Sequence, residues 1–274
     1  MISLNYRMCD PTGNITAIVL APLDLRLRRE ISDLIMRREP SCEQVGYYLS
    51  PGVGGADAAL TMAGGEFCGN ATMSAAAVLA EGLRLPAGET RECLISVSGA
   101  RLPVPVRITA RGGSEYYATV TMPPADSIEM LRLDLDTGPI PVCAVSMPGI
   151  THIIITQRLA RAQAERAVVR WCRQLKVPAL GIMQLDETHG SLEPLVYVPK
   201  SGTVFWEHSC ASGTSAVGAF LAQRDGRDRI LRLRQPGGML DIDAEYRPDG
   251  GGRLLLSGTV SLASPPKSLD FPES

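Results

Sequence analysis

The chain has 274 residues, of which 45% are apolar and 20% are charged, and its formal net charge is -2. This composition is typical of a soluble globular protein, with room for one large domain or two ordinary ones. No basic stripe with interleaved aromatic residues appears, which argues against a nucleic-acid partner. No apolar stretch reaches the roughly 18 to 20 residues of a membrane span, and the N-terminus lacks a signal-peptide pattern. We therefore expect a cytoplasmic protein with neither a membrane nor a nucleic-acid partner.

Hydrophobic patterning predicts five strands and three helices. The strands are expected at residues 15–20, 45–49, 117–122, 152–156 and 253–256, where apolar residues run together or alternate. A first helix at 23–38 has one apolar face and one charged face. The other two helices, at 71–81 and 213–224, are rich in Ala, Ser and Gly and almost free of charge. Such a composition is typical of helices packed on all sides.

The loop before each of these two uncharged helices carries a cysteine, and the sequence repeats itself there. Residues 68–80 read CGNATMSAAAVLA and residues 210–222 read CASGTSAVGAFLA. Without gaps, the Cys, Thr, Ala, Leu and final Ala positions are identical. The repeat indicates two related halves that face each other. A chance similarity between two Ala-rich helices is the alternative.

A cysteine at a helix N-terminus lies at the positive end of the peptide dipoles, which lowers the thiol pKa. The free N-H groups of the first helical turn can also bind a carboxylate. If both loops hold one carboxylate, Cys68 and Cys210 lie on opposite sides of its α-carbon, and one removes a proton while the other returns it. The N-H groups in question belong to Gly69, Asn70, Ala211 and Ser212.

The cysteine count argues against other uses of the thiols. Seven cysteines without a CxxC pair favour neither a disulfide framework nor a zinc ribbon. Only three histidines exist, and none lies at ligand spacing from Cys68 or Cys210, so we expect no metal. The remaining cysteines are expected to be small buried apolar residues. They are Cys9, Cys42, Cys93, Cys143 and Cys172.

With these motifs, nearly the whole chain resembles the diaminopimelate epimerase superfamily of cofactor-independent, two-cysteine amino-acid racemases. Its two halves carry CGN and C(G/A)SG motifs, which match residues 68–70 and 210–213. Residues 8–20 resemble its opening segment, in which Asn14 takes the place of a substrate-binding Asn. Residues 145–147 followed by His152, residues 181–184 and residues 204–210 resemble further family segments.

The resemblance implies an α+β fold of two pseudo-symmetric domains, each a curled, mostly antiparallel sheet around a central helix. The expected domains are residues 1–115, with 259–274 returning to them, and residues 116–258. The active site is expected in the interdomain cleft. The resemblance also implies a homodimer and no cofactor.

Departures from the family pattern bear on the substrate. The family's epimerases bind the distal end of diaminopimelate with three Asn and one Arg, but the matching places here hold Met62, Ala179 and His208, and the segment before His152 has lost its Asn. Diaminopimelate is therefore not the expected substrate. The short loop at 206–210 instead resembles the histidine racemases of opine-metallophore pathways.

That subgroup has an acidic residue that Glu43 would supply here, and Glu207 could hold the substrate ammonium group. For both, a solvated surface carboxylate is the alternative. His208 is a candidate pocket residue or a structural histidine, and we expect His152 to be structural or to support a site residue.

The resulting hypothesis is racemisation of a free amino acid, histidine first, by the Cys68 and Cys210 pair, with Asn14, Asn70 and Ser212 holding the carboxylate. One rival is an epimerase or isomerase of another small amino acid, such as diaminopimelate or hydroxyproline. An amino-acid-binding module without catalysis and a redox-sensing dithiol are rivals from other classes.

Overall fold

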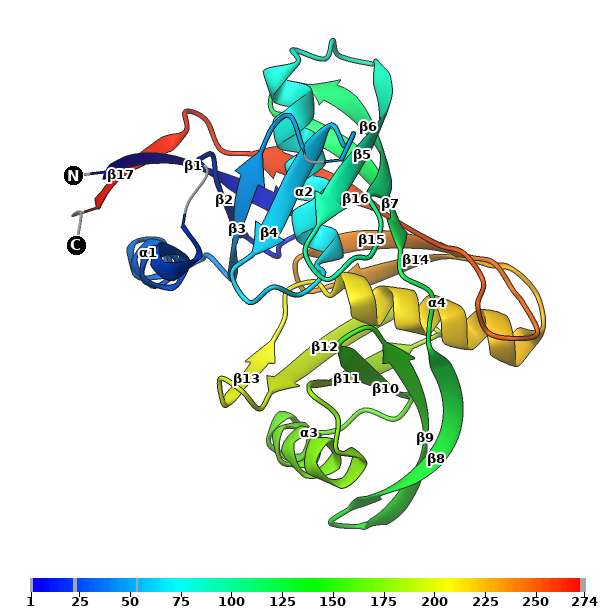
Figure 1. Ribbon diagram of the computed structural model, residues 1–274. Helices are drawn as coiled ribbons and strands as arrows, with labels where there is room; N and C mark the ends of the chain where they lie inside the picture. Colours follow the sequence, from blue (N-terminus) through cyan, green and yellow to red (C-terminus); the bar gives the residue numbers. More distant parts are fainter. Residues whose placement is uncertain (1, 22–23, 53, 272–274) are drawn as a thin grey trace. The chain divides into compact units, whose positions relative to one another are not determined.

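The computed structural model describes residues 2–21, 24–52 and 54–271, and over these ranges it contains four helices and seventeen strands. The chain is α+β, and most of its strand pairs are antiparallel (Figure 1). Its contacts divide it into two compact units. The first runs through Thr121 and takes up the residues from Ser257 onward, and the second spans Met122–Leu256. None of the helices in the described ranges is long and apolar enough to cross a membrane.

The strands of the first unit form a closed barrel. Each strand from β1 to β7 pairs with the next, and all these pairs are antiparallel except β2–β3 and β4–β5, which are parallel. Strand β16 pairs with both β1 and β7 and so closes the ring, while β17 adds to the other part of β1. The strands are β1 (Ile2–Pro11), β2 (Thr16–Val19), β3 (Gln44–Leu49), β4 (Ala58–Met62), β5 (Thr90–Val97), β6 (Val104–Gly112), β7 (Glu115–Met122), β16 (Leu254–Leu262) and β17 (Lys267–Phe271).

A helix makes each parallel connection of the first unit. Helix α1 (Leu25–Arg38) links β2 to β3, and it packs Ile31 and Ile35 into a core with Leu4 and Tyr47. Helix α2 (Gly69–Gly82) links β4 to β5 and contacts β1, β2, β4, β5 and β6. Every residue from Gly69 to Ala80 is buried. Because α2 fills the interior of the barrel, it has no exposed face for charged residues over this length.

The second unit repeats the same order of pairings. From β9 to β15 the steps are antiparallel, parallel, antiparallel, parallel and antiparallel, as they are from β1 to β6. Helix α3 (Arg161–Leu175) makes the first parallel step, and the buried helix α4 (Ala211–Asp225) makes the second. The strands are β8 (Ser127–Leu135), β9 (Gly138–Met147), β10 (Ile150–Ile155), β11 (Leu180–Asp186), β12 (Ser191–Val198), β13 (Thr203–Trp206), β14 (Arg229–Gln235) and β15 (Gly238–Ala244).

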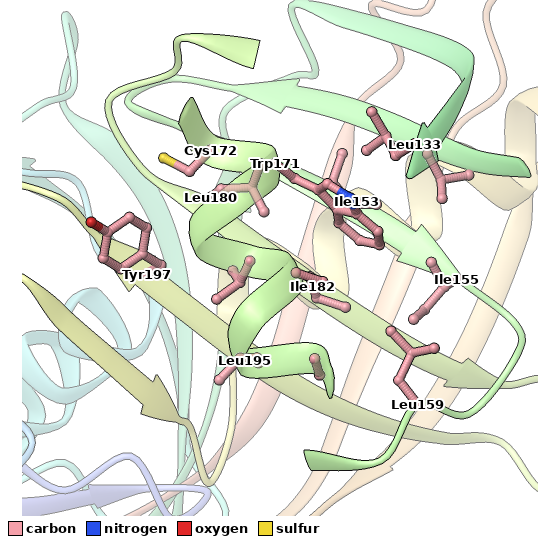
Figure 2. Packing of buried hydrophobic residues seen from close by; sticks show 14 of the residues in the cluster. Leu133, Ile153, Ile155, Leu159, Trp171, Cys172, Leu180, Ile182, Leu195 and Tyr197 are labelled. Atoms are coloured by element: carbon pink, nitrogen blue, oxygen red, sulfur yellow. The ribbon is translucent and has the colours of Figure 1, made fainter. Parts of the chain in front are cut away.

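Helix α3 was not among the three helices expected from the sequence. Its buried residues are spaced as on one helical face and pack on the sheet of the second unit, where Figure 2 shows Trp171 among Leu133, Ile153 and Leu180. Trp171 is fully buried, and its indole N-H donates to the Asp134 carbonyl at 2.9 Å. The buried face consists of Ala164, Ala167, Val168, Trp171 and Cys172.

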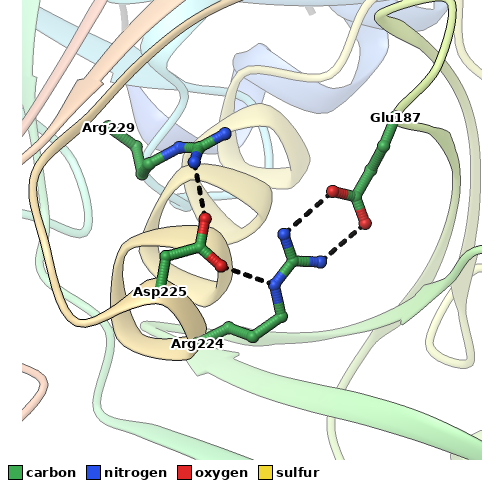
Figure 3. A network of polar contacts seen from close by, with 4 residues as sticks. All are labelled: Glu187, Arg224, Asp225 and Arg229. Atoms are coloured by element: carbon green, nitrogen blue, oxygen red, sulfur yellow. Dashed lines mark hydrogen bonds and ion pairs between the residues drawn. The ribbon is translucent and has the colours of Figure 1, made fainter.

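Polar contacts fix the far ends of the two buried helices. At the end of α2, Glu81 pairs with Arg7 of β1, whose guanidinium also donates to the Ala263 carbonyl at 2.8 Å. At the end of α4, Arg224 donates to both carboxylate oxygens of Glu187, at 2.6 and 2.9 Å (Figure 3). Asp225 accepts from Arg224 and from Arg229. The helix ends opposite the cysteines are therefore tied to their own units.

The expected strands all appear, as β2, β3, β7, β10 and β16, with altered ends. The expected helices appear as α1, α2 and α4, although residue 23 lies outside the described residues. Helices α2 and α4 each begin two residues earlier than predicted, at Gly69 and Ala211. This earlier start makes Cys68 and Cys210 the N-cap residues.

We predict that Trp171→Ala lowers the free energy of unfolding by about 3–5 kcal/mol, because it removes a large side chain from the centre of a core. Trp171→Phe keeps most of the buried apolar area and should cost clearly less. Urea unfolding of both variants, read by circular dichroism, measures the difference. Equal losses in the two variants would show that the hydrogen bond to Asp134, rather than packing, carries the contribution.

Candidate active site

Cys68 and Cys210 cap the two buried helices with the same local geometry. Their backbone angles are φ -135°, ψ 115° and φ -123°, ψ 106°. Each sulfur accepts a hydrogen bond from the N-H three residues later, at 3.4 Å from Ala71 and 3.3 Å from Gly213. In both loops the threonine four residues later donates its hydroxyl to the cysteine carbonyl at 2.7 Å. The threonine shared by the two sequence copies therefore has the same structural role in each.

In the first unit, a row of amide groups connects Cys68 to Glu43. The thiol donates to Gln44 Oε1 at 3.2 Å, Gln44 Nε2 donates to Asn14 Oδ1 at 2.6 Å, and Asn14 Nδ2 donates to Glu43 Oε2 at 2.6 Å. Gln44 Nε2 also donates to Thr16 Oγ1 at 2.8 Å. The parallel pairing of β2 with β3 sets Thr16 opposite Gln44 and so brings these groups together.

This row has a fixed direction. An ionised carboxylate only accepts hydrogen bonds, so Glu43 draws the NH₂ group of Asn14 and turns the Asn14 oxygen toward Gln44. Gln44 then directs its own NH₂ group to Asn14 and Thr16, which leaves its oxygen facing Cys68 Sγ. A carbonyl oxygen pairs with S-H and repels a thiolate. The Cys68 sulfur thus donates to Gln44 on one side and accepts from the Ala71 N-H on the other.

In the second unit, Cys210 is only 4% exposed. Burial raises the pKa of the Cys210 thiol well above its usual value, and the charge and hydrogen bond of Glu207 raise it further. The Ser212 hydroxyl, 3.6 Å from the sulfur, and the Gly213 N-H act in the opposite direction. The expectation that the helix N-terminus lowers this pKa is thus wrong for Cys210, because desolvation and a neighbouring carboxylate outweigh the dipole.

The side chains of Gln235 and His152 form hydrogen bonds with the Cys210 loop and the start of α4. Gln235, at the end of β14, accepts from the Cys210 N-H at 2.9 Å and donates to Thr214 Oγ1 at 2.8 Å. His152 of β10 lies with its Nε2 2.9 Å from Ser212 Oγ. The imidazole is completely buried, and burial lowers the pKa of His152 from 6.5 to about 3. His152 is therefore neutral at physiological pH.

The structure gathers the predicted site residues into two groups. Asn14 and Glu43 join the amide row that ends at Cys68, and Gly69 and Asn70 are the first residues of α2. Glu207 raises the pKa of the Cys210 thiol, and Ala211 and Ser212 are the first residues of α4.

The side chain of His208 is exposed, while its carbonyl accepts from the Gly237 N-H at 2.7 Å. Two further residues of the site were not predicted from the sequence. Gln44 directly follows Glu43, whereas no local pattern marks Gln235. Within the described ranges, no group of three or more His, Cys, Asp or Glu side chains could hold a metal ion.

The fold is shared with solved racemases and epimerases. A probable proline racemase from Agrobacterium radiobacter K84, with bound carbonate, matches with a TM-score of 0.70 and 14% identity, over 100% of this chain and 94% of that one. A hydroxyproline epimerase from Agrobacterium vitis, with bound trans-4-OH-L-proline, matches with a TM-score of 0.69 and 14% identity, over 98% and 92% of the chains. At this identity the likeness shows the fold.

Sequence comparison is more specific. The family model described as "Histidine racemase CntK N-terminal domain" matches residues 3–267. The chain therefore belongs to the histidine racemase family. A histidine racemase of Staphylococcus aureus strain Mu50 is 28% identical over 272 residues, which are 97% of each chain. One from Fusobacterium nucleatum is 27% identical over 269 residues, covering 94% of this chain and 97% of the other.

Burial of a neutral His152 predicts a loss of stability in acid. Between the folded pKa of about 3 and the ordinary value of 6.5, the unfolded chain binds a proton that the folded chain does not. The contribution of His152 to the free energy of unfolding should therefore rise with pH across this window, by about 1.4 kcal/mol per pH unit, and level off above it.

Urea unfolding of the wild type and of His152→Gln at about pH 5 and about pH 7 measures this contribution. The wild type should lose more stability than the variant on going to the lower pH. A stability difference between the two proteins that is the same at both pH values would contradict a buried neutral imidazole.

Proposed function

We propose that this chain interconverts the enantiomers of a free amino acid, with histidine as its substrate, and that Cys68 and Cys210 are the acid and base of the reaction. The observation that carries the proposal is the matched pair of N-cap cysteines in a chain of the histidine racemase family. Inversion of a tetrahedral carbon needs a base on one side and an acid on the other. Two thiols in equivalent positions of two similar units meet that need.

In the proposed reaction, one sulfur is a thiolate and takes the proton from the α-carbon. The electron pair of the broken C-H bond moves into the carboxylate, which becomes enediolate-like. The other sulfur is a thiol and delivers its proton to the opposite side, so that the bond re-forms with inverted configuration. Each turnover exchanges the protonation states of the two sulfurs and requires no cofactor.

The enediolate-like charge needs hydrogen-bond donors that are already in place. The proposed donors are the first-turn N-H groups at Gly69, Asn70, Ala211 and Ser212, with side-chain contacts from Asn14, Asn70 and Ser212. Because α2 and α4 are buried and fixed at their far ends, these groups are held with little freedom. A helix N-terminus also favours an anion through its dipole.

We expect substrate binding to lower the pKa of Cys210. The Glu207 carboxylate contributes to the raised pKa of Cys210 through its negative charge. If the substrate ammonium group pairs with Glu207, that charge is neutralised and the pKa of Cys210 falls. Substrate binding then favours the thiolate, against the larger effect of burial. Glu43 and His208 complete the set of proposed substrate contacts.

The finer arrangement belongs to the same proposal. It comprises two pseudo-symmetric halves of the diaminopimelate epimerase type, with both loops turned toward one substrate in the cleft of the halves. The repeated order of strand pairings and the matching N-caps support it. A cytoplasmic homodimer that serves metallophore biosynthesis is proposed from the family resemblance.

A second candidate is a racemase of proline or an epimerase of hydroxyproline, and the shared fold with a probable proline racemase and a hydroxyproline epimerase favours it. The sequence family favours histidine, because the match spans residues 3–267. Incubation with each L-amino acid, hydroxyproline and diaminopimelate in deuterated water separates the candidates. Loss of the α-proton signal with histidine alone supports the first, and loss with a cyclic imino acid supports the second. Binding without exchange would indicate a module that does not catalyse.

We predict that Cys68→Ser and Cys210→Ser each lower the rate of histidine racemisation by about 10²- to 10⁴-fold, because each removes one member of the acid and base pair. Chiral chromatography of histidine after incubation measures the rate. Cys93→Ala is the matched control, because Cys93 is buried in β5 and its thiol donates to Val106 within its own strand pair. The control should keep its activity. Normal turnover in both serine variants would refute the mechanism.

The proposed facing of the two sulfurs predicts a disulfide. Treatment with diamide, a thiol oxidant, should join Cys68 to Cys210, with loss of two hydrogens from the protein and reduction of the diamide to its hydrazide. Racemisation should stop and return with dithiothreitol. Peptide mass spectrometry identifies the linked cysteines. Inactivation without a link between residues 68 and 210, even after prolonged oxidation, would count against a shared substrate carbon.

A further inference from the structure

Behind Cys210, the side chains of Ser212 and His152 form a row that leads into the core of the second unit. Ser212 Oγ lies 3.6 Å from the Cys210 sulfur and 2.9 Å from His152 Nε2. His152 projects from β10 and is completely buried. Its other ring nitrogen, Nδ1, has no hydrogen-bond partner among the residues the structure describes. The imidazole thus makes one polar contact, and that contact is with the hydroxyl beside the thiol.

The orphaned nitrogen indicates which tautomer the ring adopts. A neutral imidazole carries its proton on one nitrogen and a lone pair on the other. A buried N-H without an acceptor is rarer in proteins than an acceptor without a donor. Placing the proton on Nε2 leaves only a lone pair unsatisfied at Nδ1. The Nε2-H then donates to Ser212 Oγ, and the hydroxyl hydrogen is free to point at the sulfur.

Gly181 holds the ring in this position. It lies opposite His152 in the parallel pair of β10 and β11, and a Cβ at residue 181 would lie 2.4 Å from His152 Nδ1 and 3.0 Å from its Cε1. Only a glycine leaves room for the imidazole there. Met183 Cε also lies close to the position of that missing Cβ. On this side the ring faces Gly181, which has no side chain and so offers Nδ1 no polar group.

We propose that His152 is a positioning residue whose Nε2-H turns the Ser212 hydroxyl toward Cys210, so that this hydroxyl donates a hydrogen bond to the sulfur when it is a thiolate. The proposal rests on the proposed function only in that Cys210 is one of the two reacting sulfurs. His152 does not exchange a proton with the thiol, because its pKa of about 3 keeps it neutral throughout the working range.

The row makes the two sulfurs unequal. Cys68 faces the carbonyl oxygen of Gln44, which suits a thiol, whereas Cys210 faces a hydroxyl that can donate. The residue that matches Ser212 in the first copy of the repeat is Asn70, which carries no hydroxyl. Cys210 thus has a side-chain hydroxyl within reach of its sulfur, and the matching position beside Cys68 offers none.

The test compares two replacements that place an amide at different ring positions. His152→Gln puts its amide nitrogen near the place of Nε2 and can still donate to Ser212. His152→Asn puts its amide nitrogen near the place of Nδ1 and does not reach the hydroxyl. The probe is methyl methanethiosulfonate, a small neutral reagent that converts a thiolate to a methyl disulfide and releases methanesulfinate. Peptide mass spectrometry follows Cys210 and Cys68 separately as a function of pH.

We expect Cys210 to react about tenfold more slowly in His152→Asn at a given pH below its apparent pKa, because a hydrogen bond to the charged sulfur is lost. His152→Gln should stay near the wild type, and Cys68 should be unchanged in both. Ser212→Ala should slow Cys210 equally, and combining it with His152→Asn should add nothing further.

Mere loosening of the core would have the opposite sign, since it would expose Cys210 and speed its modification at every pH. The proposal is overturned if His152→Asn leaves the modification rate of Cys210 unchanged, raises it, or changes the rate of Cys68 by the same factor. It is also overturned if His152→Gln behaves like His152→Asn. The readout needs no substrate, so it stands apart from the racemisation assay. Suppose that the Cys210 modification rate changes in the variants as expected, but the protein racemises no amino acid. That result would refute the proposed function and leave this inference intact.

Discussion

Burial of an uncharged helix is the constraint on which the site depends. A helix packed on all sides carries no charged residue over its buried length, so its first-turn N-H groups and its dipole supply the local electrostatics. In both units the residue that caps such a helix is a cysteine, and the sulfur accepts from the N-H three residues later. The same packing that removes water from α2 and α4 therefore fixes where the thiols lie and which donors surround them.

Burial acts differently on the two sulfurs. Cys210 is desolvated and lies beside Glu207, and both effects raise its pKa. Cys68 is less buried and ends a row of amides whose direction is set by Glu43. Similar helix caps thus give unlike environments, because the side chains that complete each site come from other strands.

Much of this arrangement could be predicted from the sequence, because it is written in local patterns. The repeat around Cys68 and Cys210 marks both buried helices, and the absence of charge marks their burial. Helix α3 could also have been found, since Ala164, Ala167, Val168 and Trp171 follow the spacing of one helical face. Strands β6 and β14 alternate between buried and exposed residues, so the same reasoning could have located them, whereas β11 is buried over six consecutive residues and has no such alternation.

The remaining features depend on pairings distant in sequence. Gln44 reaches Cys68 because β2 and β3 pair in a particular register, and Gln235 reaches the Cys210 loop from the end of β14. The direction of the Cys210 pKa shift likewise requires the burial of the thiol, since a helix N-terminus alone would predict the opposite sign. A sequence motif can thus name two candidate sulfurs, but the groups that surround them are brought there only by the folded chain.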